Sequence, residues 1–78
     1  MLERVLDLQK KEVINLSNGR RLGFVYDVEV DLETGRVGSL IVPGQNRFFR
    51  LFWKNEEYVI SFSQIKKIGD DIILVEIE

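Results

Sequence analysis

Aromatic and basic side chains are concentrated in one short stretch of the sequence, residues 47–54. The stretch holds four of the eight aromatic residues and three cations, and it contains no acid. Aromatic side chains beside arginine are enriched at protein interfaces, and they can also stack on nucleic-acid bases. The chemistry of this stretch is therefore recognition of a partner. Its candidate contact residues are Arg47, Phe48, Phe49, Arg50, Phe52, Trp53 and Lys54.

If residues 47–54 form a strand, alternate side chains point to opposite faces. One face then carries an apolar triplet, and the other carries Phe48 and Phe52 beside two cations. Only one of these faces can enter the core of a small domain, and the other leaves aromatic groups exposed. We therefore favour an interface, most simply between two copies of the chain. The alternative is a hairpin that covers the core and keeps its cations in solvent.

Three carboxylates, Asp27, Glu29 and Asp31, recur at alternate positions and would line one face of a strand about 7 Å apart. This spacing raises the alternative of a divalent-cation site. An EF-hand loop, however, needs Gly where Leu32 stands and a bidentate Glu where Gly38 stands. We predict a hydrated acidic face without a metal. Its candidate ion-pair partners are Arg20, Arg21 and Arg36.

Several classes of enzyme are excluded by the absence of two residue types. The chain has no Cys and no His, so it has no disulfide, no thiolate metal site and no Ser-His-Asp triad. A phosphate-binding loop at residues 19–23 is also unsupported, because the Gly-Lys-Ser/Thr ending is missing and no strand–loop–helix context is predicted. We predict a hairpin turn there, and a non-catalytic protein with no cofactor.

The elements that carry these residues are predicted to be mostly β. The 78 residues include 35 apolar ones, rich in Val and Ile, and no Ala, a composition that favours strands over helices. Alternation over Leu22–Val30 predicts one strand with its apolar face inward. Leu40–Val42 is apolar on both faces, which predicts a central or covered strand, and residues 63–68 fit one short helical turn with Ile65 and Ile68 inward. We predict a single domain, residues 1–78.

Charge and hydropathy narrow the location and the partners. No apolar run reaches the roughly 18 residues of a membrane span, and the start of the chain lacks the apolar region of a secretory signal. We therefore expect no membrane span and a cytoplasmic location. The net charge of -2 argues against attraction of nucleic acid to the whole surface.

The order and spacing of several short motifs resemble the PRC-barrel family over nearly the whole chain. The motifs are Gly19-x-x-Leu22-Gly23-x-Val25-x-Asp27-Val28, Asp31-x-x-Thr34-Gly35-x-Val37 and Leu40-Ile41-Val42. The later residues, including Gln64-Ile65-x-Lys67-Ile68-Gly69-Asp70-Asp71, are similar to a YlmC/YmxH-like, sporulation-associated subgroup. The resemblance implies a small, strongly bent β-barrel of about six short strands with one short helical turn.

The resemblance also implies a class of function. PRC-barrels form the cytoplasmic part of the photosynthetic reaction-centre H subunit and the C-terminal domain of a ribosome maturation factor, where they bind protein. We expect a non-catalytic protein-binding or adaptor module with a sporulation-associated role. It would act as a homodimer or dock on a larger cytoplasmic assembly, and its protein partner is not identified by the sequence. The alternative is RNA or ribonucleoprotein binding through residues 47–54.

Overall fold

The structure is a computed structural model that describes residues 2–43 and 57–77. Its elements in chain order are α1 (Val5–Leu8), β1 (Glu12–Asn15), β2 (Arg21–Phe24), β3 (Asp27–Asp31), β4 (Arg36–Pro43), β5 (Glu57–Ser61), the 3₁₀ turn η1 (Phe62–Gln64), β6 (Ile65–Ile68) and β7 (Ile72–Val75). The mostly β composition predicted from the sequence is confirmed. No helix among the described residues is long and apolar enough to cross a membrane.

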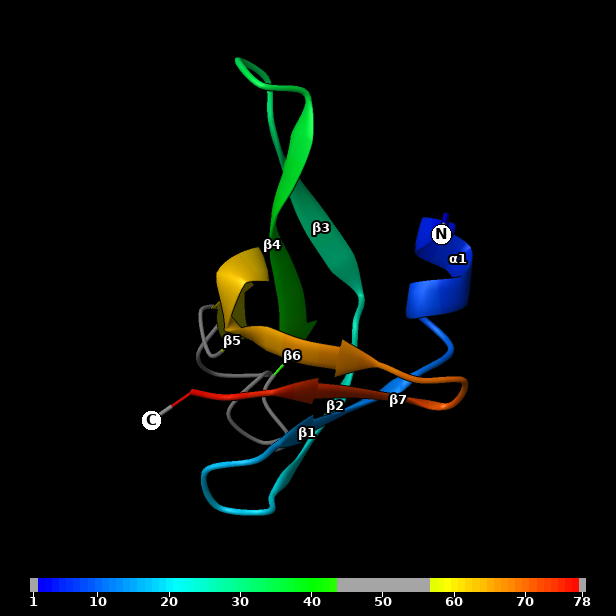
Figure 1. The fold of residues 1–78 in the computed structure, drawn as a ribbon, viewed down its shortest axis with the longest axis vertical. Helices are drawn as coiled ribbons and strands as arrows, with labels where there is room; N and C mark the ends of the chain where they lie inside the picture. The colour runs from blue at the N-terminus through cyan, green and yellow to red at the C-terminus, as the bar shows by residue number, and fades with distance from the viewer. Residues whose placement is uncertain (1, 44–56, 78) are drawn as a thin grey trace, which may run out of the picture.

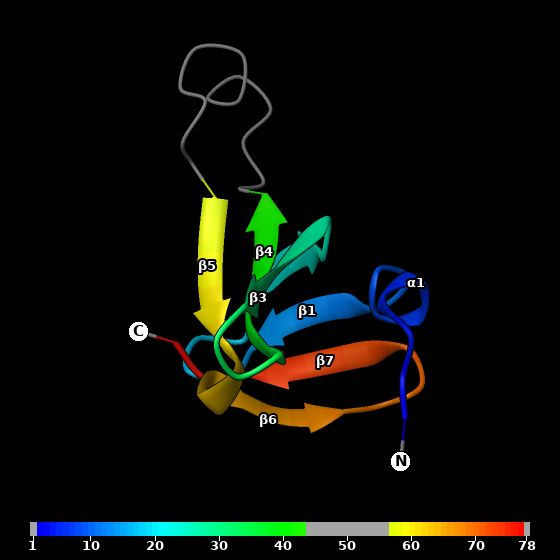
Figure 2. The ribbon, with the colours of Figure 1, turned by 90° about the horizontal axis from the view of Figure 1, so that it is seen from above.

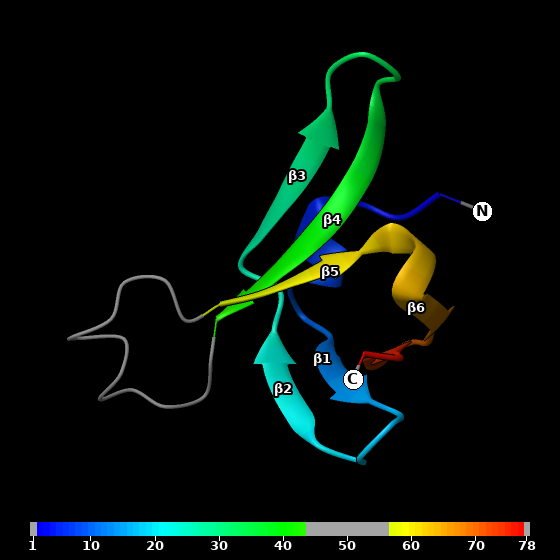
Figure 3. The same cartoon turned by 90° about the vertical axis from the view of Figure 1, so that its left-hand side faces the viewer.

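The strands form two sheets (Figure 1). One sheet has the order β2-β1-β7-β6, with β1 and β7 parallel, and the other has the order β3-β4-β5 and is antiparallel throughout. The β3–β4 hairpin projects from the four-stranded sheet, and the two sheets meet where β4 contacts β2 (Figure 3). The described strands thus enclose one core between two sheets.

The core is a cluster of aliphatic side chains contributed by both sheets. Its buried members are Leu8, Val13, Leu22, Val25, Leu40, Val42, Ile60, Ile73 and Val75. Most of them alternate with exposed or half-buried neighbours, as expected for strands that cover a core with one face. Ile65 and Ile68 pack against this cluster, so their predicted inward direction is confirmed.

Two elements differ from the sequence prediction. Residues 65–68 form strand β6 and not a helical turn, because only Phe62–Gln64 takes the 3₁₀ conformation. This raises the number of strands in the described residues to seven. The single strand predicted over Leu22–Val30 is instead β2 and β3, which belong to different sheets. Val25, between the two strands, is buried. Tyr26, just before β3, and Val30, on β3, are each 51% exposed.

A buried side chain, Asn15, ties the end of the chain to β1. Asn15 is 1% exposed, and its Oδ1 accepts hydrogen bonds from the backbone N–H groups of Ser17 and Ile77, each at 3.1 Å. A buried polar atom is tolerated where it is hydrogen-bonded in this way. The contact closes the four-stranded sheet at the end where β1 and β7 finish.

Gly23 allows the chain to leave β2 for the other sheet. Its φ is +117°, in the region that L side chains rarely adopt. A Cβ at this position would meet Val42 Cγ1 at 3.7 Å and the Pro43 carbonyl oxygen at 3.8 Å, which are ordinary contacts. The requirement for glycine is therefore conformational and not steric.

Replacing Gly23 by alanine should lower the free energy of unfolding by about 1–3 kcal/mol, because alanine must adopt a strained φ. The control is Gly69→Ala, where φ is not positive and the nearest atoms to the new Cβ lie at 3.5 Å. Urea unfolding of both variants is the measurement. Equal stabilities for the two variants would contradict the conformational role of Gly23.

Candidate functional site

The contact residues predicted from the sequence lie outside the described residues. All of them, Arg47, Phe48, Phe49, Arg50, Phe52, Trp53 and Lys54, fall between Pro43 and Glu57. In the chain they connect β4 to β5. The site is therefore built from the described strands on either side of this connection.

Strand β4 carries apolar side chains on both faces. It is the central strand of the three-stranded sheet, as the run Leu40–Val42 predicted. Leu40 and Val42 belong to the core cluster, so Ile41 between them points to the opposite face. Ile41 is nevertheless only 5% exposed. The face of the sheet directed away from the core thus also has an apolar centre.

Neighbouring strands place further apolar groups on this outer face. Ile41 lies opposite Val59 on β5 and Asp27 on β3, and residues directly opposite one another share a face. Val59 is 55% exposed. The Ile41 carbonyl accepts a hydrogen bond from the Tyr26 backbone N–H at 3.0 Å.

The hydroxyl of Tyr26 fixes the position of its ring. It donates a hydrogen bond to Glu57 Oε2 at 2.9 Å, and Glu57 shares the face of Val59 because the two are two positions apart along β5. We call Tyr26, Ile41 and Val59 the outer patch. The patch is apolar at its centre and has the Glu57 and Asp27 carboxylates at its border, an arrangement found in protein interfaces.

Apolar exposure in this protein is large for its size. Among the described residues, eleven large hydrophobic side chains are exposed and ten hydrophobic side chains are buried. Single exposed apolar residues are ordinary, and several of these stand alone, such as Leu32 in the β3–β4 turn. The outer patch differs because it joins three parts of the chain: Val59 lies opposite Ile41 in the β4–β5 register, and Tyr26, just before β3, bonds through its backbone N–H to the Ile41 carbonyl.

Two carboxylates of β3 accept hydrogen bonds from backbone N–H groups that lie close to them in the chain. Asp27 Oδ1 accepts from the Val28 N–H at 2.8 Å, and Asp31 Oδ1 accepts from the N–H groups of Glu33 at 2.9 Å and Thr34 at 3.4 Å. Such bonds are typical of turns that begin with aspartate. Within residues 2–43 and 57–77, no three acidic, histidine or cysteine side chains gather as a metal would require.

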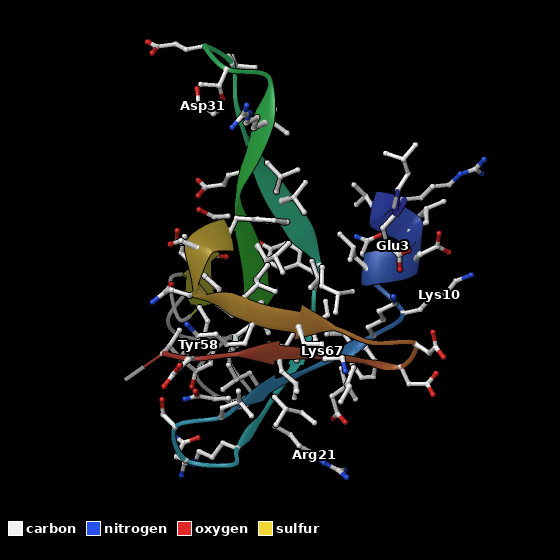
Figure 4. The ribbon with its side chains drawn as sticks, viewed as in Figure 1. Glu3, Lys10, Arg21, Asp31, Tyr58 and Lys67 are labelled. Atoms are coloured by element: carbon white, nitrogen blue, oxygen red, sulfur yellow. The ribbon has the colours of Figure 1, made fainter. Side chains whose placement is uncertain are left out.

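Of the three arginines considered as partners of the β3 acids, Arg36 lies opposite Asp31 in the β3–β4 register, whereas Arg21 pairs elsewhere. Arg21 Nε lies 3.7 Å from Glu12 Oε1 on the neighbouring strand, and Figure 4 places Arg21 and Asp31 at opposite ends of the molecule. Arg20 follows a hairpin turn in which its N–H donates to Asn18 Oδ1 at 3.0 Å. The predicted hairpin between β1 and β2 is confirmed.

A charged hollow lies beside α1. It has a volume of about 400 Å³, and Glu3, Asp7, Lys10, Lys11, Asp70 and Asp71 contribute to its lining. Lys11 is 8% exposed, and its Nζ pairs with Glu3 Oε1. The buried amine is thus engaged with a carboxylate, which gives it a structural role in holding the N-terminal segment against β1.

The turn role of Asp31 can be separated from cation binding. We expect Asp31→Ala to lower the free energy of unfolding by about 0.5–1.5 kcal/mol, since both turn N–H groups lose their acceptor. Asp31→Asn should retain most of the stability, because the amide oxygen can still accept. Calcium or magnesium should leave the melting temperature of the wild type unchanged. A cation-dependent rise in the wild type that is absent in Asp31→Asn would show a metal site instead.

Comparison with known proteins agrees with this fold. The model of the PRC-barrel domain family matches residues 2–78. The chain is 38% identical over 73 residues to the "Probable sporulation protein YlmC" of Bacillus subtilis, covering 94% of this chain and 90% of that protein.

Two further relatives have no function in their names. One, from Clostridium acetobutylicum, is 37% identical over 68 residues, covering 87% of this chain and 77% of the relative. The other, the uncharacterized protein YmxH of Bacillus subtilis, is 26% identical over 76 residues, covering 95% of this chain and 88% of the relative. The match to the family model and the two relatives above one-third identity lead to the same conclusion: this chain belongs to the PRC-barrel family, with YlmC and YmxH among its relatives.

Proposed function

We propose that this PRC-barrel chain is a non-catalytic protein-binding module of the cytoplasm in which residues 1–78 act as one domain. It works by self-association as a homodimer or by docking on a larger assembly. The observation that carries the proposal is the outer patch, in which Tyr26 and Val59 are more than half exposed beside the buried Ile41 on the sheet face directed away from the core. Apolar surface of this kind is stabilised when a partner removes it from water.

The sequence adds recognition chemistry in the segment that precedes β5. In the sequence, only two residues, Asn55 and Glu56, separate the stretch 47–54 from the start of β5. The four aromatic side chains and three cations of this stretch have the composition of interface anchors with complementary charge. We propose Phe48, Phe49, Phe52 and Trp53 as the anchors, and the cations of the same stretch as the groups that set orientation.

The similarity to a probable sporulation protein supports a role in sporulation. The match covers almost the whole of both chains, so the relative carries no large additional domain that would account for its association with that process. We therefore propose that this chain contributes to the same process through the contacts of the PRC-barrel domain itself.

RNA or ribonucleoprotein binding is the second candidate function. It is favoured by one feature, the alternation of aromatic and cationic residues in the stretch 47–54, which suits base stacking and phosphate contact. The net charge of -2 and the exposed acids of β3 oppose it. Protein binding is the better supported of the two.

Mass in solution tests the role of residues 47–54. We expect a dimeric wild type, and folded monomers for Phe52→Asp and Trp53→Asp, because a carboxylate cannot be buried in an apolar contact without a large cost. Leu32→Asp is the control, since Leu32 is 92% exposed in the β3–β4 turn and its replacement should leave the dimer intact. A monomeric wild type, together with unfolding of both variants, would show that the segment belongs to the core.

Retention of single-stranded RNA tests the second candidate. At low ionic strength we expect no retention of RNA on filters above that of a control protein of similar charge. The chain contacts phosphates if three results occur together: RNA is retained, its affinity falls steeply with salt, and Arg50→Ala weakens the binding. That result would place RNA binding ahead of protein binding.

A further inference from the structure

The sheets present four edge strands, and three of them have features that discourage pairing with another chain. In the described residues, the pairing of β2, β3 and β6 with their neighbours is interrupted by an irregularity in register. In addition, β3 carries three acids, β6 carries Lys66 and Lys67, and β2 contacts β4. Bulges, charged side chains and coverage are the usual protections of a sheet edge.

Strand β5 has none of these protections over its described length. Its five residues pair with β4 without any shift in register, and Glu57 at its start is its only charged residue. Figure 2 shows β5 on the side of β4 away from β3, with no described strand beside its other edge. Tyr58 and Val59 are 36% and 55% exposed.

The hydrogen-bonding direction of β5 follows from that of β4. The Ile41 carbonyl bonds to Tyr26 on the β3 side, and successive residues of a strand direct their backbone groups to alternate sides. Leu40 and Val42 therefore face β5, where their partners are Ile60 and Tyr58. Val59, between these partners, directs its N–H and C=O to the open edge.

The edge of β5 that is available for pairing is short, because a side chain already accepts the backbone N–H at the end of the strand. The Ser61 N–H, the next group of the same orientation, is already bonded to Gln64 Oε1 at 2.9 Å. Only Glu57 and Val59 thus present outward backbone groups over β5. A long peptide strand could not continue its ladder past Ser61. A short, self-complementary pairing is the better match to this edge.

We propose that β5 pairs antiparallel with β5 of a second copy, about a two-fold axis at Val59. The two Val59 residues exchange two N–H···O=C bonds, and Tyr58 of each copy lies beside Ile60 of the other. Glu57 faces Ser61 of the other copy, so no like charges oppose one another, and a net charge of -2 per chain resists association only weakly. The result is a continuous six-stranded sheet with the outer patches of both copies on one face.

This interface rests on the self-association in the proposed function, and it specifies where that association occurs. Pairing about the axis also places two exposed valines in contact, together with two aromatic–β-branched pairs, which stabilise cross-strand contacts. The occupant of the open edge is thus a second copy of the chain, which supplies a strand of the same pattern and length.

The test compares Val59→Lys with Val30→Lys by sedimentation equilibrium. Val30 is a matched control because it lies on β3, the other edge of the same sheet, and is 51% exposed against 55% for Val59. We expect Val59→Lys to weaken the dimer about tenfold or more, because the two-fold axis brings the introduced ammonium groups together. Val30→Lys should keep the wild-type dissociation constant.

The alternative outcomes separate the interface from the function. A dimeric wild type with equal dissociation constants for both variants overturns pairing through β5 and leaves self-association standing. A wild type that is monomeric at all concentrations overturns both, and leaves docking on a different protein as the remaining form of the function.

Amide hydrogen exchange of the wild type tests the interface without any substitution. The Val59 N–H should exchange slowly at high protein concentration and rapidly on dilution below the dissociation constant. The Ile60 N–H, which faces Leu40 within the sheet, should remain protected in both conditions. Concentration-independent exchange at Val59 in a dimeric wild type would contradict the proposal.

Discussion

The two-sided apolar character of β4 is the constraint on which the rest of the structure depends. A domain with one core can bury only one face of each strand in it, and β4 uses Leu40 and Val42 for that purpose. Ile41 is left on the other face, where it is also removed from water. Val59 lies opposite Ile41 on β5, and Tyr26, just before β3, bonds through its backbone N–H to the Ile41 carbonyl. The outer patch thus exists because β4 has apolar side chains on both faces, and both faces are removed from water.

The two sheets also differ at their edges. In the four-stranded sheet the edges carry cations that pair with acids on the neighbouring strand or segment, as in Arg21 with Glu12 and Lys66 with Glu76. Exposed pairs of this kind add little stability, but charged edges discourage further pairing. In the three-stranded sheet the acids are confined to β3, where two of them hold backbone N–H groups of β3 or the following turn. Strand β5 is left regular and nearly uncharged.

The sequence was sufficient for some features and not for others. Composition predicted a β protein, the pair Asn18-Gly19 predicted the first hairpin, and Leu40–Val42 predicted a central strand. The unbroken alternation from Leu22 to Val30 predicted one strand and was wrong, because Gly23 takes a positive φ and Val25 and Tyr26 connect two strands that belong to different sheets. The outer patch could not be predicted, since its residues are distant in sequence and are joined only by the pairing of β4 with β5 and by the hydrogen bond between Tyr26 and Ile41. The one signal in the sequence was the run Leu40–Val42, because it places an apolar side chain, Ile41, on the face opposite to Leu40 and Val42. The predictions for residues 47–54 remain predictions.

The location of the buried polar groups also bears on where association takes place. Asn15 joins β1 to the end of the chain through two hydrogen bonds, and Lys11 joins β1 to the N-terminal segment through Glu3. Both contacts satisfy buried polar atoms within a single chain. The three-stranded sheet has a different character: among the described residues no strand lies beside the outer edge of β5, and the Val59 side chain is 55% exposed. A partner therefore gains hydrogen bonds and apolar contact at β5 without disturbing the contacts that hold the termini.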